Sequence, residues 1–166
     1  LPVTQNEVQF PEGKKLISST DLQGNILHCN DAFEQISGYS RDELIGQPHN
    51  LIRHPDMPPE AFQVMWDTLK AGSPWMGLVK NRCKNGDHYW VNAYVTPVTE
   101  GGKVIGYESV RTCPDRKDVE RADKLYAKIR EKGVKFPGPS LINEWTVLGL
   151  FIVVSILAIL MSQPLV

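Results

Sequence analysis

The residues best suited to chemistry lie together in one short segment, Arg53-His54-Pro55-Asp56-Met57-Pro58. This segment places a guanidinium, an imidazole and a carboxylate among prolines, which fix φ and bias the preceding residue toward extended backbone. It is therefore a stiffened loop, and loops held by a rigid scaffold often carry binding residues. A plain surface connection would have the same composition, so both interpretations stay open at this point.

The elements predicted before this loop are short. Strands are predicted over residues 16–20 and 26–29, on either side of a turn at Asp21-Leu22-Gln23-Gly24-Asn25. A helix should start at Asn30 or Asp31 and end at Gly38, and a capping box at Ser40 predicts a second, very short helix.

A longer helix and three more strands are predicted after the loop. The helix has one apolar face made by Phe62, Met65, Trp66 and Leu69, and Gly72 ends it. The strands are predicted over residues 75–81, 89–98 and 104–111, with hairpin turns between them. The order predicts an α+β domain, in which short helices close one face of a single antiparallel sheet around a central cavity.

A charged helix is predicted over residues 115–132. Its narrow apolar stripe consists of Val119, Ala122, Leu125, Tyr126 and Ile129. The stripe could pack on the sheet of the same chain, or it could form a dimer seam or a signal-carrying linker. Both possibilities remain open. Residues 136–144, rich in proline and glycine, predict a hinge.

The run from Trp145 to Met161 carries no charged residue. At 1.5 Å per residue a helix of this length reaches about 25 Å, near the ~30 Å of a bilayer core, so a transmembrane or membrane-anchor segment is predicted. The preceding segment is rich in Lys and Arg, which places that side in the cytoplasm, and Trp145 suits the membrane interface. Residues 162–166 would begin a continuation.

Composition argues against several other classes of protein. The formal net charge of -1 is unlike the strongly basic face of a nucleic-acid-binding domain. Three widely spaced cysteines without a CxxC motif suggest neither a disulfide framework nor a zinc site. The sequence offers no recognisable nucleophile–base pair or metal cluster, so an enzyme is the weakest of the interpretations.

Several motifs together resemble the PAS sensory domain family over about residues 15–113. The general family pattern is carried by Asp21-Leu22-x-Gly24-x-Ile26, Asn30-Asp31-Ala32-Phe33, Ser37-Gly38-Tyr39-Ser40 and Glu43-Leu44-Ile45-Gly46. A finer resemblance, to the aerotaxis receptors, is carried by Gly46-Gln47-Pro48-His49-Asn50, Arg53-His54-Pro55-Asp56-Met57-Pro58, Pro74-Trp75-x-Gly77 and the stretch from Lys80 to Val91.

The resemblance implies a five-stranded PAS fold that binds FAD without covalent attachment and reads its redox state as a measure of oxygen or electron transport. It also implies an anchor in the bacterial inner membrane with the PAS domain on the cytoplasmic side. The receptor would be a homodimer. After the membrane anchor, a HAMP-type relay and a signalling domain would follow along the chain, and the signalling domain would bind a chemotaxis histidine kinase and a coupling protein. The predicted organisation is an N-terminal arm (1–14), the PAS domain (15–113), a linker helix (114–135), the hinge (136–144), the membrane segment (145–161) and the continuation (162–166).

The expected FAD-binding residues come from the resemblance together with side-chain chemistry. Asn81 offers an amide donor and acceptor to the flavin's pyrimidine edge, and Arg53 suits phosphate or reduced-flavin charge. His54 and Asp56 are implied by the family motif, with an indirect role left open. Trp66 and Trp75 could stack on the adenine or the isoalloxazine ring of FAD, or belong to the core. Arg111, where light-sensing relatives have glutamine, could sense and relay the flavin state.

One position separates this chain from light-sensing flavin relatives. His49 stands where those domains place a reactive cysteine, so photoadduct chemistry is not expected. Two other functions remain as alternatives: a haem-binding PAS oxygen sensor, which would use one of the four histidines, or a PAS module that dimerises without a cofactor.

Overall fold

The structure is a computed structural model that describes residues 2–9 and 13–133. Its elements confirm the predicted order of two strands, short helices and three strands. They are β1 (Leu16–Thr20), β2 (Ile26–Cys29), α1 (Asp31–Ser37), α2 (Arg41–Leu44), the 3₁₀ helix η1 (His49–Ile52), α3 (Pro59–Lys70), β3 (Trp75–Arg82), β4 (His88–Glu100), β5 (Lys103–Thr112) and α4 (Arg116–Lys132).

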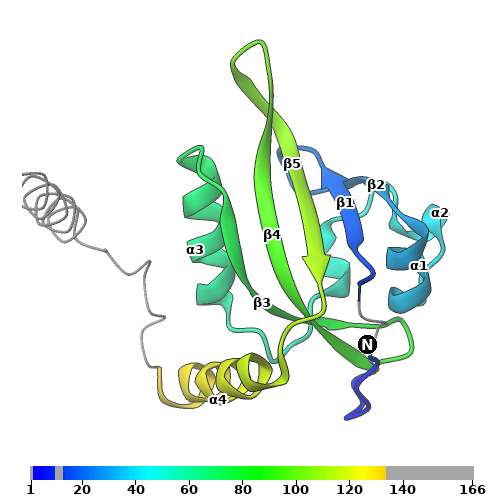
Figure 1. The fold of residues 1–166 in the computed structure, drawn as a ribbon, viewed down its shortest axis with the longest axis vertical. Coiled ribbons are helices and arrows are strands. Elements are labelled where there is room, and N and C mark those ends of the chain that lie inside the picture. Colours follow the sequence, from blue (N-terminus) through cyan, green and yellow to red (C-terminus); the bar gives the residue numbers. More distant parts are fainter. Residues whose placement is uncertain (1, 10–12, 134–166) are drawn as a thin grey trace, which may run out of the picture. The chain divides into compact units, whose positions relative to one another are not determined.

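The five strands form one antiparallel sheet in the order β2-β1-β5-β4-β3. Figure 1 shows the long β4–β5 hairpin at its centre, with α3 near one side and α1 and α2 near the other. Asn81 pairs with Tyr89, and Ala93 pairs with Arg111 on the next strand. Because side chains alternate along a strand, these residues share one face of the sheet, which we call the inner face, and Lys80 and Trp90 share the outer face.

Local sequence explains where the first helices begin and end. Asn30 accepts a hydrogen bond from the Phe33 amide at 3.2 Å and so caps the start of α1. Gly38 ends this helix with φ at 74°, a left-handed conformation that glycine adopts without steric cost. The predicted capping box between Ser40 and Glu43 is present at the start of α2.

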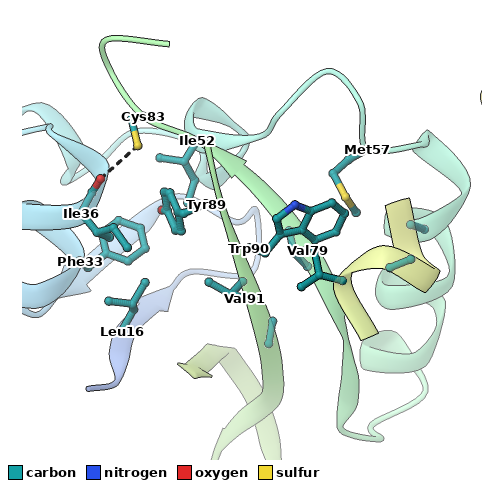
Figure 2. Packing of buried hydrophobic residues seen from close by; sticks show 14 of the residues in the cluster. Leu16, Phe33, Ile36, Ile52, Met57, Val79, Cys83, Tyr89, Trp90 and Val91 are labelled. Carbon is teal, nitrogen blue, oxygen red and sulfur yellow. Dashed lines mark hydrogen bonds between the residues drawn. The ribbon is translucent and has the colours of Figure 1, made fainter. Parts of the chain in front are cut away.

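Helix α4 packs on the outer face of the sheet belonging to its own chain. The Tyr126 ring stacks on Trp90 with centroids 6.1 Å apart, and its hydroxyl donates to the Leu78 carbonyl oxygen at 2.7 Å. Figure 2 shows Trp90 in a buried cluster that also contains Val79 and Met57. The structure therefore shows the first predicted alternative, packing on the sheet of the same chain. A dimer seam or a signal-carrying linker stays a prediction.

The predicted N-terminal arm is partly hydrogen-bonded to the domain rather than loose. The Thr4 amide donates to the Gly86 carbonyl oxygen at 2.8 Å, and the Val8 amide donates to that of His88 at 2.7 Å. Glu7 accepts from Arg116 at 2.7 Å, which ties the arm to the first turn of α4.

The predicted hinge (136–144), membrane segment (145–161) and continuation (162–166) lie outside the described residues. Within residues 2–9 and 13–133, none of the helices is long and apolar enough to cross a membrane.

Candidate functional site

A cavity of about 330 Å³ lies between the inner face of the sheet and the segment that runs from η1 to α3. This volume falls in the usual range of small-molecule sites, ~300–1,000 Å³. Its walls are mainly apolar and aromatic, with a few polar groups at defined places, as such sites require. The apolar residues are Phe62, Met65, Trp66, Leu69, Trp75, Val79, Ala93, Val95 and Tyr107.

Arg111 supplies a buried positive charge to this cavity. Its side chain is 5% exposed, and its guanidinium donates to Ser18 Oγ at 3.1 Å and to His49 Nε2 at 2.7 Å. No carboxylate forms an ion pair with it in the part of the chain that the structure describes. Burial of this charge lowers the pKa of Arg111 to about 10. A buried cation of this kind favours an anionic or electron-rich ligand.

His49 faces the same cavity and is held as an acceptor by Arg111. Burial and the Arg111 charge together lower the pKa of His49 to about 3. Because the guanidinium has no lone pair to offer, His49 must accept through Nε2 and is neutral, with its proton on Nδ1. The pair therefore presents one positive charge, on Arg111, and one neutral imidazole ring to the cavity.

Asn81 and Ser109 supply neutral polar groups to the same cavity. Asn81 is 3% exposed, and its Nδ2 has no hydrogen-bond partner among the described residues. The Ser109 hydroxyl also lacks a partner there. A buried polar atom without a partner costs roughly 1–3 kcal/mol, so both groups favour a polar ligand edge next to them.

Arg53 lies where the loop meets the cavity. Its guanidinium stacks over the Phe62 ring, 4.3 Å from the centroid, and donates to the Met57 carbonyl oxygen at 3.0 Å. The backbone of Arg53 forms an isolated antiparallel bridge with Asn81 of the edge strand β3. The loop therefore covers the free edge of the sheet and holds Arg53 near Asn81.

The two predicted tryptophans both line the cavity. Trp66 contacts Tyr107 edge to face, with ring centroids 5.4 Å apart. Trp75 lies over Gly77 on the same strand, where an added Cβ would lie 2.5 Å from the indole ring. Glycine is therefore needed at position 77 for the indole to keep this position.

The structure does not bring His54 and Asp56 to the cavity. The ring of His54 is buried against His88, and its Nδ1 accepts from the Asp56 amide at 3.1 Å. Asp56 Oδ2 accepts from Lys80 Nζ at 2.6 Å, and the Asp56 backbone oxygen accepts from Arg130 of α4. The two residues thus join the loop to β3 and α4 on the side away from the cavity, and Asp56 does not cap α3.

Burial and nearby charge shift the protonation of this pair. Burial, followed by the Lys80 charge, lowers the pKa of His54 to about 4, so the ring is neutral. Burial alone would raise the pKa of Asp56, but the hydrogen bond and charge of Lys80 outweigh it and the pKa lies below its usual range. Asp56 is therefore a carboxylate that partly neutralises the buried ammonium of Lys80.

Of the seven predicted binding residues, five line the cavity: Arg53, Trp66, Trp75, Asn81 and Arg111. Sequence reasoning did not include His49, Ser18, Ser109 or Tyr107 among them. For His49 a signal existed, because it occupies the position of the reactive cysteine in light-sensing relatives. For Ser18, Ser109 and Tyr107 there was no such signal. The sequence does not show which inner-face residues of a strand line a cavity and which are packed within the core.

Comparisons of the sequence and the structure with known proteins agree with the fold described above. A family model described as the PAS fold matches residues 26–111. The aerotaxis receptor of Escherichia coli (strain K12) is 52% identical over 124 residues, which cover 75% of this chain and 24% of that protein. A nitrogen fixation regulatory protein of Klebsiella pneumoniae is 39% identical over 82 residues, covering 49% of this chain and 17% of its own length.

A solved Light-Oxygen-Voltage domain from a flavin-analogue study superposes with a TM-score of 0.59 at 19% identity, covering 72% of this chain and 89% of that one, and so shares the fold. The chain spans about a quarter or less of the length of these two curated relatives. The match to the family model and the identity to the aerotaxis receptor show that the chain belongs to the PAS family and carries a PAS domain of the aerotaxis-receptor type.

Proposed function

We propose that this chain is the sensory part of a redox or oxygen receptor. Its PAS domain would bind FAD non-covalently and pass the flavin's redox state to a downstream chemoreceptor signalling module. The observation that carries the proposal is the buried guanidinium of Arg111, which has no carboxylate partner among the described residues and lies with His49 at a largely apolar cavity. Bound FAD would supply reversible electron uptake.

The residues around the cavity fit the demands of a flavin. A flat ring needs apolar walls, which Trp66 and Trp75 help to provide. Its pyrimidine edge needs paired donors and acceptors, and Asn81 has a free amide donor at the cavity. The phosphates of the dinucleotide would lie toward the loop, where Arg53 lines the cavity and offers a guanidinium.

The chain's own residues would also respond to the charge of the ligand. Arg111 would hold a negative charge that develops on the flavin when it is reduced, because buried, correctly oriented charges act strongly in a water-poor site. His49 is neutral beside it and could take up a proton on Nε2 if that negative charge drew Arg111 away. Electron uptake would then change the Arg111–His49 contact.

His54 and Asp56 have an indirect role in this proposal. The His54 amide hydrogen-bonds the Lys80 carbonyl oxygen at 3.4 Å, and the Asp56 carboxylate hydrogen-bonds the Lys80 ammonium. Since Asn81 follows Lys80 and pairs with Arg53, these bonds keep both cavity residues in place. The same loop contacts Arg130, which gives a short route from the cavity to α4.

The wider organisation follows the aerotaxis receptor, with which this chain shares 52% identity. We propose a homodimer anchored in the bacterial inner membrane through residues 145–161, with the PAS domain on the cytoplasmic side. It would signal through a further domain to a chemotaxis histidine kinase and coupling protein. In this proposal the chain is a signal transducer rather than an enzyme.

The absorbance spectrum of the purified protein, recorded before and after anaerobic reduction, tests the cofactor. Flavin bands that bleach on reduction would support the proposal, and Asn81→Ala should lose bound FAD while Asn92→Ala, on the outer face, should keep it. A Soret band would instead indicate haem. Haem has weaker support, because among the described histidines only His49 lines the cavity and its Nε2 already accepts from Arg111. A colourless protein that takes up no added FAD would leave a module without a cofactor.

A further inference from the structure

Helix α4 carries a continuous basic stripe on its exposed face. The stripe consists of Lys117, Arg121, Lys124, Lys128 and Lys132, all exposed. Their spacing of four, three, four and four residues places them on one side of an α-helix over a length of about 22 Å. A surface helix with mixed charge would normally alternate signs along each face, so this stripe calls for an explanation.

The opposite face of α4 is already occupied. Val119, Ala122, Tyr126 and Ile129 are buried against the domain, and Tyr126 hydrogen-bonds to β3. Docking through this face therefore fixes the basic stripe toward the solvent.

The stripe is only weakly neutralised by its surroundings. Arg121 pairs with Asp118 at 2.9 Å, whereas the four lysines form no ion pair within residues 2–9 and 13–133. Glu120 and Glu131 lie at the margin of the stripe and Asp123 lies farther round the helix. A straight row of one sign is thus available to an extended anionic surface.

The sequence after α4 indicates which anionic surface that is. The uncharged run that starts at Trp145 begins 13 residues after Lys132. Whatever its conformation, a stretch of this length spans at most roughly 45 Å. If the run enters a membrane, as proposed above, it keeps the stripe within reach of the lipid headgroups and raises their effective concentration. Lysines next to a membrane segment bind anionic lipid at about 1 kcal/mol each.

We propose that the basic stripe of α4 docks on anionic phospholipid headgroups at the membrane surface. This inference rests on the proposed membrane attachment and not on flavin binding. Docking would hold the PAS domain at a defined orientation to the membrane, because the other face of the same helix is packed on the sheet. A change in the hydrogen bond between Arg130 and the Asp56 backbone oxygen would then be passed to α4, which is held by the sheet on one face and by the lipid headgroups on the other.

Vesicle binding tests this proposal with a protein of residues 1–136. Among the described residues, every buried core residue lies between Leu16 and Ile129, and residues 1–136 form one compact unit. It also lacks the apolar run, so its binding reports on the stripe alone. We expect it to sediment with vesicles of phosphatidylcholine and phosphatidylglycerol in equal parts, not with phosphatidylcholine alone, and to dissociate as salt is raised.

Charge-matched variants separate a specific surface from net charge. Lys117→Gln with Lys124→Gln and Lys128→Gln should weaken binding by about 100-fold, at about 1 kcal/mol per lysine. Lys15→Gln with Lys70→Gln and Lys103→Gln removes the same charge elsewhere and should leave binding unchanged. Glutamine and lysine have similar helix propensities, and circular dichroism with a thermal melt checks that both variants fold.

Three results would overturn the proposal: no binding to the anionic vesicles at low salt, equal losses in the two triple variants, or tighter binding to polyglutamate than to the vesicles, which would indicate an acidic protein partner. The flavin spectrum, recorded on the same samples, should be the same in all variants. A failure of lipid docking is thereby distinguished from a failure of flavin binding.

Discussion

Asp56 Oδ2 lies 2.6 Å from Lys80 Nζ, on the side of the sheet away from the cavity. Lys80 is only 6% exposed, and its neighbour Asn81 points to the inner face, where it lines the cavity. On β3, Lys80 therefore forms an ion pair on the outer face of the sheet, and the next residue, Asn81, offers a polar group to the cavity on the inner face. The loop that begins with Arg53 connects the two.

Removing the Asp56 charge should destabilise the domain. Asp56→Asn leaves the buried Lys80 ammonium without a carboxylate, which costs less than the ~3–5 kcal/mol of a fully buried pair because Asp56 is partly exposed. We expect a loss of about 1–2 kcal/mol in the free energy of unfolding, measured in urea. Glu43→Gln, which breaks the exposed pair with Lys84, should change it much less. Equal effects of the two variants would contradict the role given to Asp56.

The stability of the domain should decrease as the pH falls below about 6.5. The unfolded chain protonates its histidines near pH 6.5, whereas His49 and His54 stay neutral in the folded state until about pH 3 and 4. Between these values the unfolded state binds more protons, so acid favours unfolding. The lowered pKa of Asp56 adds a further loss only below its ordinary value of 3.8.

Urea unfolding at pH 7.5 and at pH 5 measures this dependence. His49→Gln should flatten the slope in that interval, and His28→Gln, at an exposed position on β2, should leave it unchanged. If the pH dependence of the unfolding free energy were the same in His49→Gln as in the wild-type protein, the His49 ring of the wild-type protein would protonate as freely when folded as when unfolded.

Arg111 should stabilise the reduced flavin more than the oxidised flavin. Arg111→Gln removes the buried charge, keeps a polar side chain and should lower the midpoint potential of bound FAD. A tenfold loss in preference for the reduced form corresponds to about 59 mV for one electron. Spectroscopic redox titration measures this shift, with Lys70→Gln on the exposed end of α3 as the control. An unchanged potential in a variant that retains FAD would contradict the proposed role of Arg111.

The docking of α4 should depend on Tyr126. Tyr126→Phe removes the hydroxyl that donates to the Leu78 carbonyl oxygen and should cost about 1 kcal/mol. Tyr126→Ala also removes the ring stacked on Trp90 and should cost about 3–5 kcal/mol. Proteolysis within α4 should become faster in the same order. Fast cleavage in the wild-type protein would show that the helix is not held on the sheet.

Gly77 should be required for the shape of the cavity. Gly77→Ala places a Cβ about 2.5 Å from the Trp75 ring, so the indole must move. We expect weaker FAD retention and a changed tryptophan fluorescence spectrum. Gly72→Ala has open space around its Cβ, so it should affect stability through its left-handed backbone and leave retained FAD unchanged.

The sequence by itself determined the order and type of the elements, because turns, caps and apolar periodicity are local signals. The Asn30 cap, the Ser40 capping box and the helical spacing of Phe62, Met65 and Trp66 each act within one or two turns of chain. The loop of residues 53–58 was also identified, since its proline spacing is visible without a fold. The resemblance to a family then pointed to Asn81 and Arg111.

Only the tertiary structure decided which of these side chains share a space. Arg111 and His49 are 62 positions apart and meet because β5 lies at the centre of the sheet, opposite η1. The loop that carries His54 and Asp56 pairs with the edge strand β3 through the backbone of Arg53. Arg53 lies at the cavity, whereas His54 and Asp56 lie on the opposite side of the sheet, next to Lys80. Local signals carry no information on such pairings, since strand register and the packing of helices on a sheet depend on contacts between distant parts of the chain.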